Sequence, residues 1–98
     1  MDNNVTNNKQ TAGPAEAIDA LDRLLAEAHA AHQVGEITVV EESLKVQRSY
    51  CRVAVVISAY GTHIEIGSKH GLDSQITWTF REEDLDKARA LLVDYSSN

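Results

Sequence analysis

Residues 50 to 60 alternate between two kinds of side chain. The odd positions are all apolar or small: Cys51, Val53, Val55, Ile57 and Ala59. The even positions are mixed: Tyr50, Arg52, Ala54, Val56, Ser58 and Tyr60. A period of two is typical of a β-strand that buries one face. The segment therefore predicts a long half-buried strand, and the rest of the chain must cover its odd-numbered face.

A glycine directly follows this strand. Gly61-Thr62 has glycine in the first place, as in a two-residue type II′ hairpin loop. That turn predicts one set of pairs on the even face: Tyr60 with His63, Ser58 with Glu65, and Val56 with Gly67. It predicts a second set on the core face: Ala59 with Ile64, and Ile57 with Ile66.

Two further segments also have strand character. Ile76, Trp78 and Phe80 alternate with Gln75, Thr77 and Thr79, which predicts a strand with Trp78 buried against Leu21, Leu25 or Leu92. Ile37 to Val46 is extended but changes parity, which predicts a β-bulge near Glu41-Glu42. A turn around Gln47–Ser49 then leads into the long strand.

Two segments with helical spacing enclose these strands. Pro14 suits the first helical position, and the apolar stripe that follows is Ile18, Leu21, Leu25, Ala28 and His32. Gly35 is predicted to end this helix as a left-handed cap. For the second helix, Thr79 and Glu82 have the spacing of a capping box. Its predicted buried stripe is Leu85, Ala88, Leu92 and Tyr95.

The sequence therefore predicts an α+β fold with the order α-β-β-β-β-α. Four antiparallel strands in a meander make a sheet about 19 Å wide, which two helices of about 10 Å can cover on one face only. We expect both helices on one face and the other face open. Residues 1–12 are predicted to be a disordered tail, because they contain little that can be buried, and residues 13–98 a single domain.

Composition restricts the function. The 98 residues include 15 Asp and Glu against 9 Lys and Arg, a formal net charge of −6. This argues against a duplex nucleic-acid binder that contacts phosphates directly, and against a polybasic membrane protein. There is no apolar run long enough to span a bilayer and no secretory signal, so we expect a cytoplasmic protein. A single cysteine, Cys51, excludes an internal disulfide.

Three groups of residues are candidates for catalysis, metal binding or anion binding. Ser58, His63 and Glu65 would share one sheet face, as in a hydrolase, but without a pocket or an oxyanion hole. His29 and His32 are three residues apart on a helix, with no clear third metal ligand. Lys69 to Gly71 lies in a glycine-bounded segment that resembles an anion-binding loop only weakly. We therefore predict no enzymatic activity, no cofactor and no metal.

The open sheet face is the predicted binding surface. Its candidate partner-binding residues are Tyr50, Arg52, Val56, Tyr60, His63 and Glu65, among them types enriched at binding hot spots. The leading hypothesis is a small acidic interaction protein that binds another macromolecule, most simply a protein. It would act as an inhibitor, immunity protein or adaptor of the kind that phages and mobile elements encode. The alternatives are a homodimer joined through the open face, a small-ligand-binding domain, and a small hydrolase.

Overall fold

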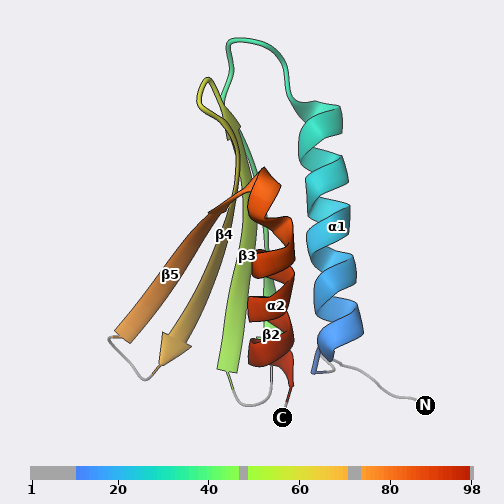
Figure 1. Ribbon diagram of the computed structural model, residues 1–98, viewed down its shortest axis with the longest axis vertical. Helices are drawn as coiled ribbons and strands as arrows, with labels where there is room; N and C mark the ends of the chain where they lie inside the picture. The colour runs from blue at the N-terminus through green and yellow to red at the C-terminus, as the bar shows by residue number, and fades with distance from the viewer. Residues whose placement is uncertain (1–10, 47–48, 71–73, 98) are drawn as a thin grey trace, which may run out of the picture.

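The computed structural model describes residues 11–46, 49–70 and 74–97 and has the order α-β-β-β-β-α. The elements are α1 (Pro14–Ala31), β2 (Thr38–Val46), β3 (Ser49–Ser58), β4 (Gly61–His70), β5 (Ser74–Arg81), the 3-10 turn η1 (Glu82–Asp84) and α2 (Leu85–Ser96). The strands form one antiparallel sheet in the order β2-β3-β4-β5, and both helices lie against the same face of it (Figure 1). The predicted α+β fold is confirmed.

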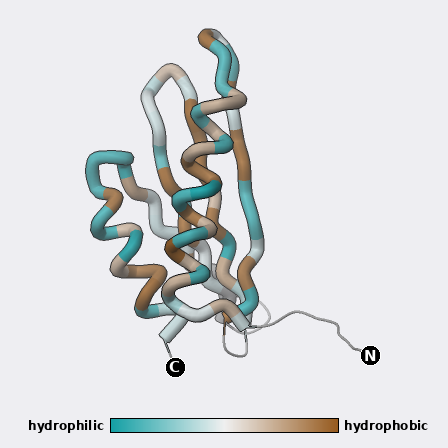
Figure 2. Tube along the Cα trace, turned by 90° about the vertical axis from the view of Figure 1, so that its right-hand side faces the viewer, coloured by the Kyte–Doolittle hydropathy of each residue, from teal (hydrophilic) through white to brown (hydrophobic). Residues whose placement is uncertain are grey.

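The core lies between the helices and the sheet. Hydrophobic and hydrophilic residues alternate along both helices (Figure 2), and the hydrophobic ones of α1 are directed at the sheet. The largest fully buried side chains are Leu21, Leu92, Val53, Val55, Ile64, Ile66 and Cys51. Burial of each large aliphatic side chain contributes about 1.5–3 kcal/mol. The odd face of β3 is thus inside, as its alternation predicts.

Helix α1 begins at Pro14, as the sequence predicts. Gly13 is the N-cap, Pro14 opens the first turn, and the Gly13 amide donates to Glu16 Oε1 over 2.9 Å. The helix ends at Ala31 with His32 as C-cap, so Gly35, at φ +91°, lies in the following loop and does not end it. The Ala12 amide donates to the carbonyl oxygen of Lys45, so the folded part of the chain includes Ala12. Residues 1–10 of the predicted tail lie outside the described residues.

The β3–β4 hairpin closes two residues earlier than predicted. Ser58 pairs with Gly61, so Ala59 and Tyr60 form the turn, and both are exposed. Gly61 follows the turn with φ +108°, a conformation that side chains with a Cβ rarely adopt. The predicted pairs were wrong by four residues: Val56 pairs with His63, not Gly67. Because the register shifts by an even number of residues, all the residues that remain in the two strands keep their predicted faces.

Strand β2 is regular where a bulge was expected. Its pairing with β3 runs without interruption from Thr38 opposite Ile57 to Val46 opposite Ser49. Leu44 and Val46 are buried on the helical side, while Ile37 and Val39 remain on the open side at 74% and 49% exposure. The apolar residues change from odd to even positions without a bulge, so the two odd ones, Ile37 and Val39, are exposed. Residues 47–48, part of the predicted turn, lie outside the described residues.

Strand β5 is less covered than predicted. Trp78 is opposite Ile66 on the helical face but is 48% exposed, and Ile76 is 46% exposed. The reason is geometric. β5 is an edge strand, and its N-terminal half lies farther from α2 than its C-terminal end does (Figure 1). The Trp78 indole N–H donates to the hydroxyl of Tyr95 on α2 over 3.0 Å. The predicted burial of Trp78 was wrong.

The start of α2 also differs from the prediction. Thr79 belongs to β5, and the chain passes through η1 before α2 begins, with Asp84 as N-cap. The capping box was wrong because strand pairing of Thr79 with Glu65 holds the threonine in the sheet. Ala88 and Leu92 are buried as predicted, and Leu85 and Tyr95 pack at the edge of the core.

Polar contacts join the helical layer. Arg89 of α2 bonds Asp22 of α1 over 2.9 Å, and His29 of α1 lies 3.2 Å from Glu82 of η1. Across the described part of the chain, no helix has the combination of length and apolar character needed to cross a membrane.

Candidate functional site

The open face of the sheet is ordered in rows that cross the strands. Residues paired in adjacent strands project to the same side, so the register shows which side chains are neighbours. The row that crosses all four strands nearest the β3–β4 turn is Val39, Val56, His63 and Arg81. The next row is Glu41, Ala54, Glu65 and Thr79.

Arg52 occupies the centre of this face. Its Nε donates to Glu41 Oε1 over 2.8 Å, and its Nη1 donates to Glu65 Oε1 over 3.1 Å. These two carboxylates flank Ala54, which is completely buried although it belongs to the open face. The arginine therefore reaches along its own strand, joins β2 to β4 through β3, and covers Ala54.

The hydrogen bonds between Arg52 and the two carboxylates favour the charged forms of Arg52 and Glu41. Hydrogen bonding to Arg52 holds the pKa of the Glu41 carboxyl below its ordinary value, and the Arg52 pKa is raised by hydrogen bonds to Glu41 and Glu65. Two of the candidate partner-binding residues, Arg52 and Glu65, are thus engaged with each other. A partner would have to displace an existing ion pair to use either of them.

The two candidate tyrosines lie at opposite ends of the face. Tyr50 is at the start of β3, and Tyr60 is in the turn after its end, so a ten-residue strand, about 30 Å long, separates them. Tyr60 is 91% exposed and Tyr50 is 49% exposed. Tyr60 and His63 line one hollow, and His63 is opposite Val56, whereas Tyr50 is at the other end of β3.

Apolar side chains gather at the Tyr60 end. Val34 is 99% exposed and Ile37 is 74% exposed, and both line a hollow of about 500 Å³ with Tyr60. Val39 is two residues further along the same face as Ile37, and Val56 is opposite Val39. We call these five residues (Val34, Ile37, Val39, Val56 and Tyr60) the apolar patch.

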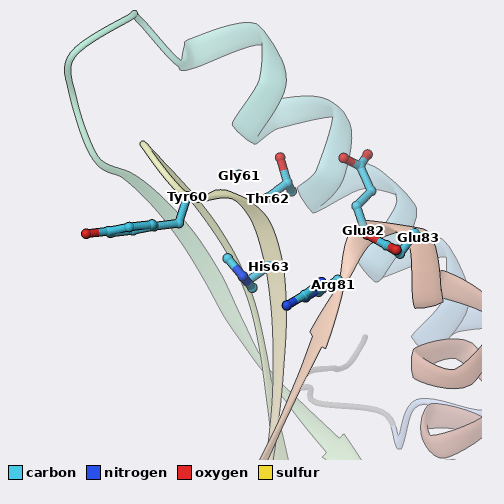
Figure 3. Close-up of a pocket in the computed structure, with 7 residues that line it drawn as sticks. All are labelled: Tyr60, Gly61, Thr62, His63, Arg81, Glu82 and Glu83. Carbon is cyan, nitrogen blue, oxygen red and sulfur yellow. The ribbon is translucent and has the colours of Figure 1, made fainter.

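A second, more polar hollow adjoins the patch. It has a volume of about 670 Å³ and lies between the β3–β4 turn and the start of η1. Figure 3 shows its lining residues Tyr60, Gly61, Thr62, His63, Arg81, Glu82 and Glu83. His63 and Arg81 are directly opposite each other in the β4–β5 register, and their nitrogen-bearing ends lie close together in Figure 3.

Two residues of the alternative hydrolase hypothesis are bonded to other groups. Ser58 is opposite Gly61, not Glu65, and its hydroxyl accepts the amide hydrogen of Tyr60 over 3.2 Å. Glu65 is bonded to Arg52. Both groups that an acyl-transfer triad would require beside His63 are therefore bonded to other residues.

The structure also does not bring together the candidate metal ligands or form the candidate anion-binding loop in the residues that it describes. His29 is beside Glu82, whereas His32 Nδ1 is 2.9 Å from Thr38 Oγ1, so the two histidines do not converge. Lys69 and His70, which the sequence places in a loop-like segment, continue β4 and pair with Gln75 and Ser74 of β5. Gly71 lies outside the described residues. Within the described ranges, no three His, Cys, Asp or Glu side chains are grouped as metal ligands.

Cys51 is fully enclosed on the core face of β3. Burial raises the pKa of its thiol to about 11, so the reactive thiolate is scarce at neutral pH.

Sequence reasoning missed four residues of this end of the molecule: Val34, Ile37, Val39 and Arg81. The odd parity of Ile37 and Val39 was a usable signal, because a regular strand with Leu44 inward leaves both outward. Arg81 was taken as part of a helix, and only the β5 register reveals that it faces His63. Comparisons with models of protein families, with curated proteins and with solved structures find no match to this chain.

Proposed function

We propose that this chain is a non-enzymatic binding module that attaches to another protein through the apolar patch. The observation that supports the proposal best is the concentration of exposed large apolar side chains at one end. Val34, Ile37 and Tyr60 are each more than 70% exposed, and they line one hollow. Within such a module, the roles of inhibitor, immunity protein and adaptor share the same physical requirement, a stable surface for a partner.

Exposed apolar area of this kind is costly to leave in water. Each large aliphatic side chain gains about 1.5–3 kcal/mol when it is moved from water into an apolar environment. Contiguous apolar patches with a polar rim are typical of interaction sites. Here the rim is supplied by His32, Glu36, Ser58 and His63. The hollow between Ile37 and Tyr60 would receive an apolar side chain of the partner.

Catalysis on the same face has less support. A hydrolase would need Ser58 and Glu65 to act with His63, and both are committed to other partners, the Tyr60 amide and Arg52. Cys51 is enclosed and its thiol is protonated at neutral pH. Binding requires none of these groups to be rearranged.

The test is affinity capture from a lysate of the organism that encodes the chain. Wild type and the double variant Ile37→Ser/Val39→Ser are immobilised in parallel, and bound proteins are identified by mass spectrometry. Both side chains are exposed, so the variant should keep its melting temperature. We expect a protein that wild type retains and the double variant does not. Equal retention by both would contradict the proposal.

The oligomeric state separates a second copy from a different partner. Sedimentation of the purified chain at two concentrations a hundredfold apart should give the same mass. A doubling of mass that Ile37→Ser/Val39→Ser abolishes would assign the patch to a homodimer and replace the proposed partner by the chain itself.

A further inference from the structure

Arg81 differs from every other arginine that the structure describes. Arg23 is paired with Glu27 and Glu42, Arg52 with Glu41 and Glu65, and Arg89 with Asp22. The side chain of Arg81 is exposed and makes no hydrogen bond or ion pair with any residue in 11–46, 49–70 or 74–97. The described residues of this acidic chain thus leave the Arg81 guanidinium available. It can bind a carboxylate of another molecule in bidentate form.

His63 lies directly opposite this arginine. Because the two are cross-strand partners on the open face, their Cβ atoms lie about 5 Å apart. The imidazole ring can donate an N–H whichever tautomer is present. The neighbouring carboxylates do not use these donors: Glu82 is bonded to His29, and Figure 3 shows Glu82 and Glu83 pointing away from the Arg81 guanidinium. Two adjacent donor groups therefore face the same open hollow.

The same row has an apolar half. Val39 and Val56 are its members on β2 and β3, while His63 and Arg81 are its members on β4 and β5. The middle of the apolar pair and the middle of the donor pair are two strand spacings apart, about 10 Å. A ligand that matches the row has an apolar group and an anionic group at that separation.

The distribution of charge favours an anionic ligand here and not elsewhere. The two helices and η1 carry nine Asp and Glu against three Lys and Arg, so the helical layer is strongly acidic. On the open face, Arg52 offsets one of the two negative charges of Glu41 and Glu65, and Lys45 and Arg81 add two positive charges at open-face positions. An acidic segment of a partner is thus repelled by one side of the molecule and accepted by the other.

We infer that Arg81 and His63 bind a carboxylate of the partner protein, next to an apolar side chain of the same segment that rests on Val39 and Val56. This inference rests on the proposed function and specifies the chemistry of the partner. In a polyproline II segment, residues i and i+3 project to the same side about 9.3 Å apart. A segment of the form apolar-x-x-acidic therefore fits the row.

The experiment is a titration of the ¹⁵N-labelled chain followed by NMR, with three capped tetrapeptides as probes. They are acetyl-Leu-Pro-Pro-Glu-amide, its Gln analogue, and acetyl-Gly-Pro-Pro-Glu-amide. We expect the Leu/Glu probe to shift the amides of Val39, Val56, His63 and Arg81, and to bind at least fivefold more tightly than either analogue. Arg81→Gln should remove the preference for Glu over Gln. Lys87→Gln, which removes one charge from the helical layer, should retain it.

Three results would overturn the inference. Equal affinities for the Glu and Gln probes, or no shift in the row with any probe, would exclude carboxylate recognition. Inorganic phosphate that shifts His63 and Arg81 and binds more tightly than the Leu/Glu probe would assign the pair to a phosphoryl ligand. Each of these leaves the apolar patch untouched, and the capture experiment with Ile37→Ser/Val39→Ser decides the proposed function separately.

Discussion

Arg52 and Arg81 lie on the same face of the sheet in opposite electrostatic surroundings. Arg52 is held between Glu41 and Glu65 and covers Ala54, so it stabilises the sheet itself. Arg81 faces His63 and has no carboxylate partner among the described residues. The two arginines thus differ in their neighbours, and this difference is visible only in the cross-strand register.

The role of Arg52 can be measured through Glu41. Arg52→Met keeps the length of the side chain but removes its hydrogen bonds, so the Glu41 pKa should rise toward its ordinary value of 4.5. At neutral pH the melting temperature should fall by about 2–5 °C, as expected for modest ion pairs in a domain of this length. NMR titration of the Glu41 carboxyl carbon and thermal melting provide the two readouts.

The sign of the pH dependence follows from the lowered pKa. The stabilisation from Glu41 is present above its unfolded pKa and is lost as the pH falls through the folded value, below 4.5. Arg52→Met should therefore differ most from wild type at neutral pH and converge with it in acid. A Glu41 pKa that does not move in Arg52→Met would show that the two side chains are not bonded in solution.

Cys51 provides a second test at the residue scale. Its thiol pKa is raised from 9.0 to about 11 by burial, so the unfolded chain loses this proton at lower pH than the folded one. The free energy of unfolding should consequently decrease between pH 9 and pH 11, by about 1.4 kcal/mol per pH unit at most. Urea unfolding across this range measures the slope.

Cys51→Ala is the control for other groups that titrate in alkali. It is less stable throughout, because a small cavity remains, but its slope between pH 9 and pH 11 should be shallower than that of wild type. Identical slopes would mean that the thiol is not buried in the native state.

At the scale of elements, the β3–β4 turn determines which residues meet on the open face. Gly61 has φ +108° with open space around it, so a Cβ there meets no neighbour but strains the backbone. Gly61→Ala should lower the free energy of unfolding by about 1–2 kcal/mol, measured by urea unfolding. Gly61→Asn should lose less, because asparagine tolerates a positive φ better. An alanine variant as stable as wild type would contradict a turn at Ala59-Tyr60.

The sequence predicts the faces of this hairpin but not its register. Alternation of apolar and polar residues specifies which side each residue is on, and a slip by an even number of residues leaves that unchanged. Gly61 was compatible both with opening a turn and with following one. The order of elements, the face of β3 and the position of α1 were predictable, because each depends on local periodicity or on Pro14.

Coverage of the sheet was harder to predict. The two helices were expected to cover the full width, but β5 diverges from α2, and Trp78 and Ile76 are half exposed as a result. Such divergence depends on the twist of the sheet and on where η1 turns the chain, neither of which has a local sequence signal. Of the candidate site, Tyr60 and His63 line one hollow and His63 is opposite Val56. Arg81 could not be predicted, because the capping-box spacing of Thr79 and Glu82 places it in a helix.

On the scale of the whole molecule, the charge and the apolar surface are segregated. The helical layer is acidic, Arg52 offsets one of the two carboxylate charges at the centre of the open face, and the apolar patch with Arg81 lies at one end. Under the proposed function, this arrangement would orient an acidic partner before contact, because the excess of carboxylates lies on the helical side. On the same proposal, the end that carries Tyr60 is the contact surface, and the end that carries Tyr50 is not.

The most direct test compares these two tyrosines. Tyr60→Ser and Tyr50→Ser are the same substitution on the same face, about 30 Å apart along β3. Calorimetric titration with the captured partner should give an affinity for Tyr60→Ser that is weaker by about 2 kcal/mol or more, roughly thirtyfold, as for a hot-spot aromatic. Tyr50→Ser should bind as wild type does. Wild-type affinity for Tyr60→Ser, with the loss found in Tyr50→Ser instead, would contradict binding through the apolar patch.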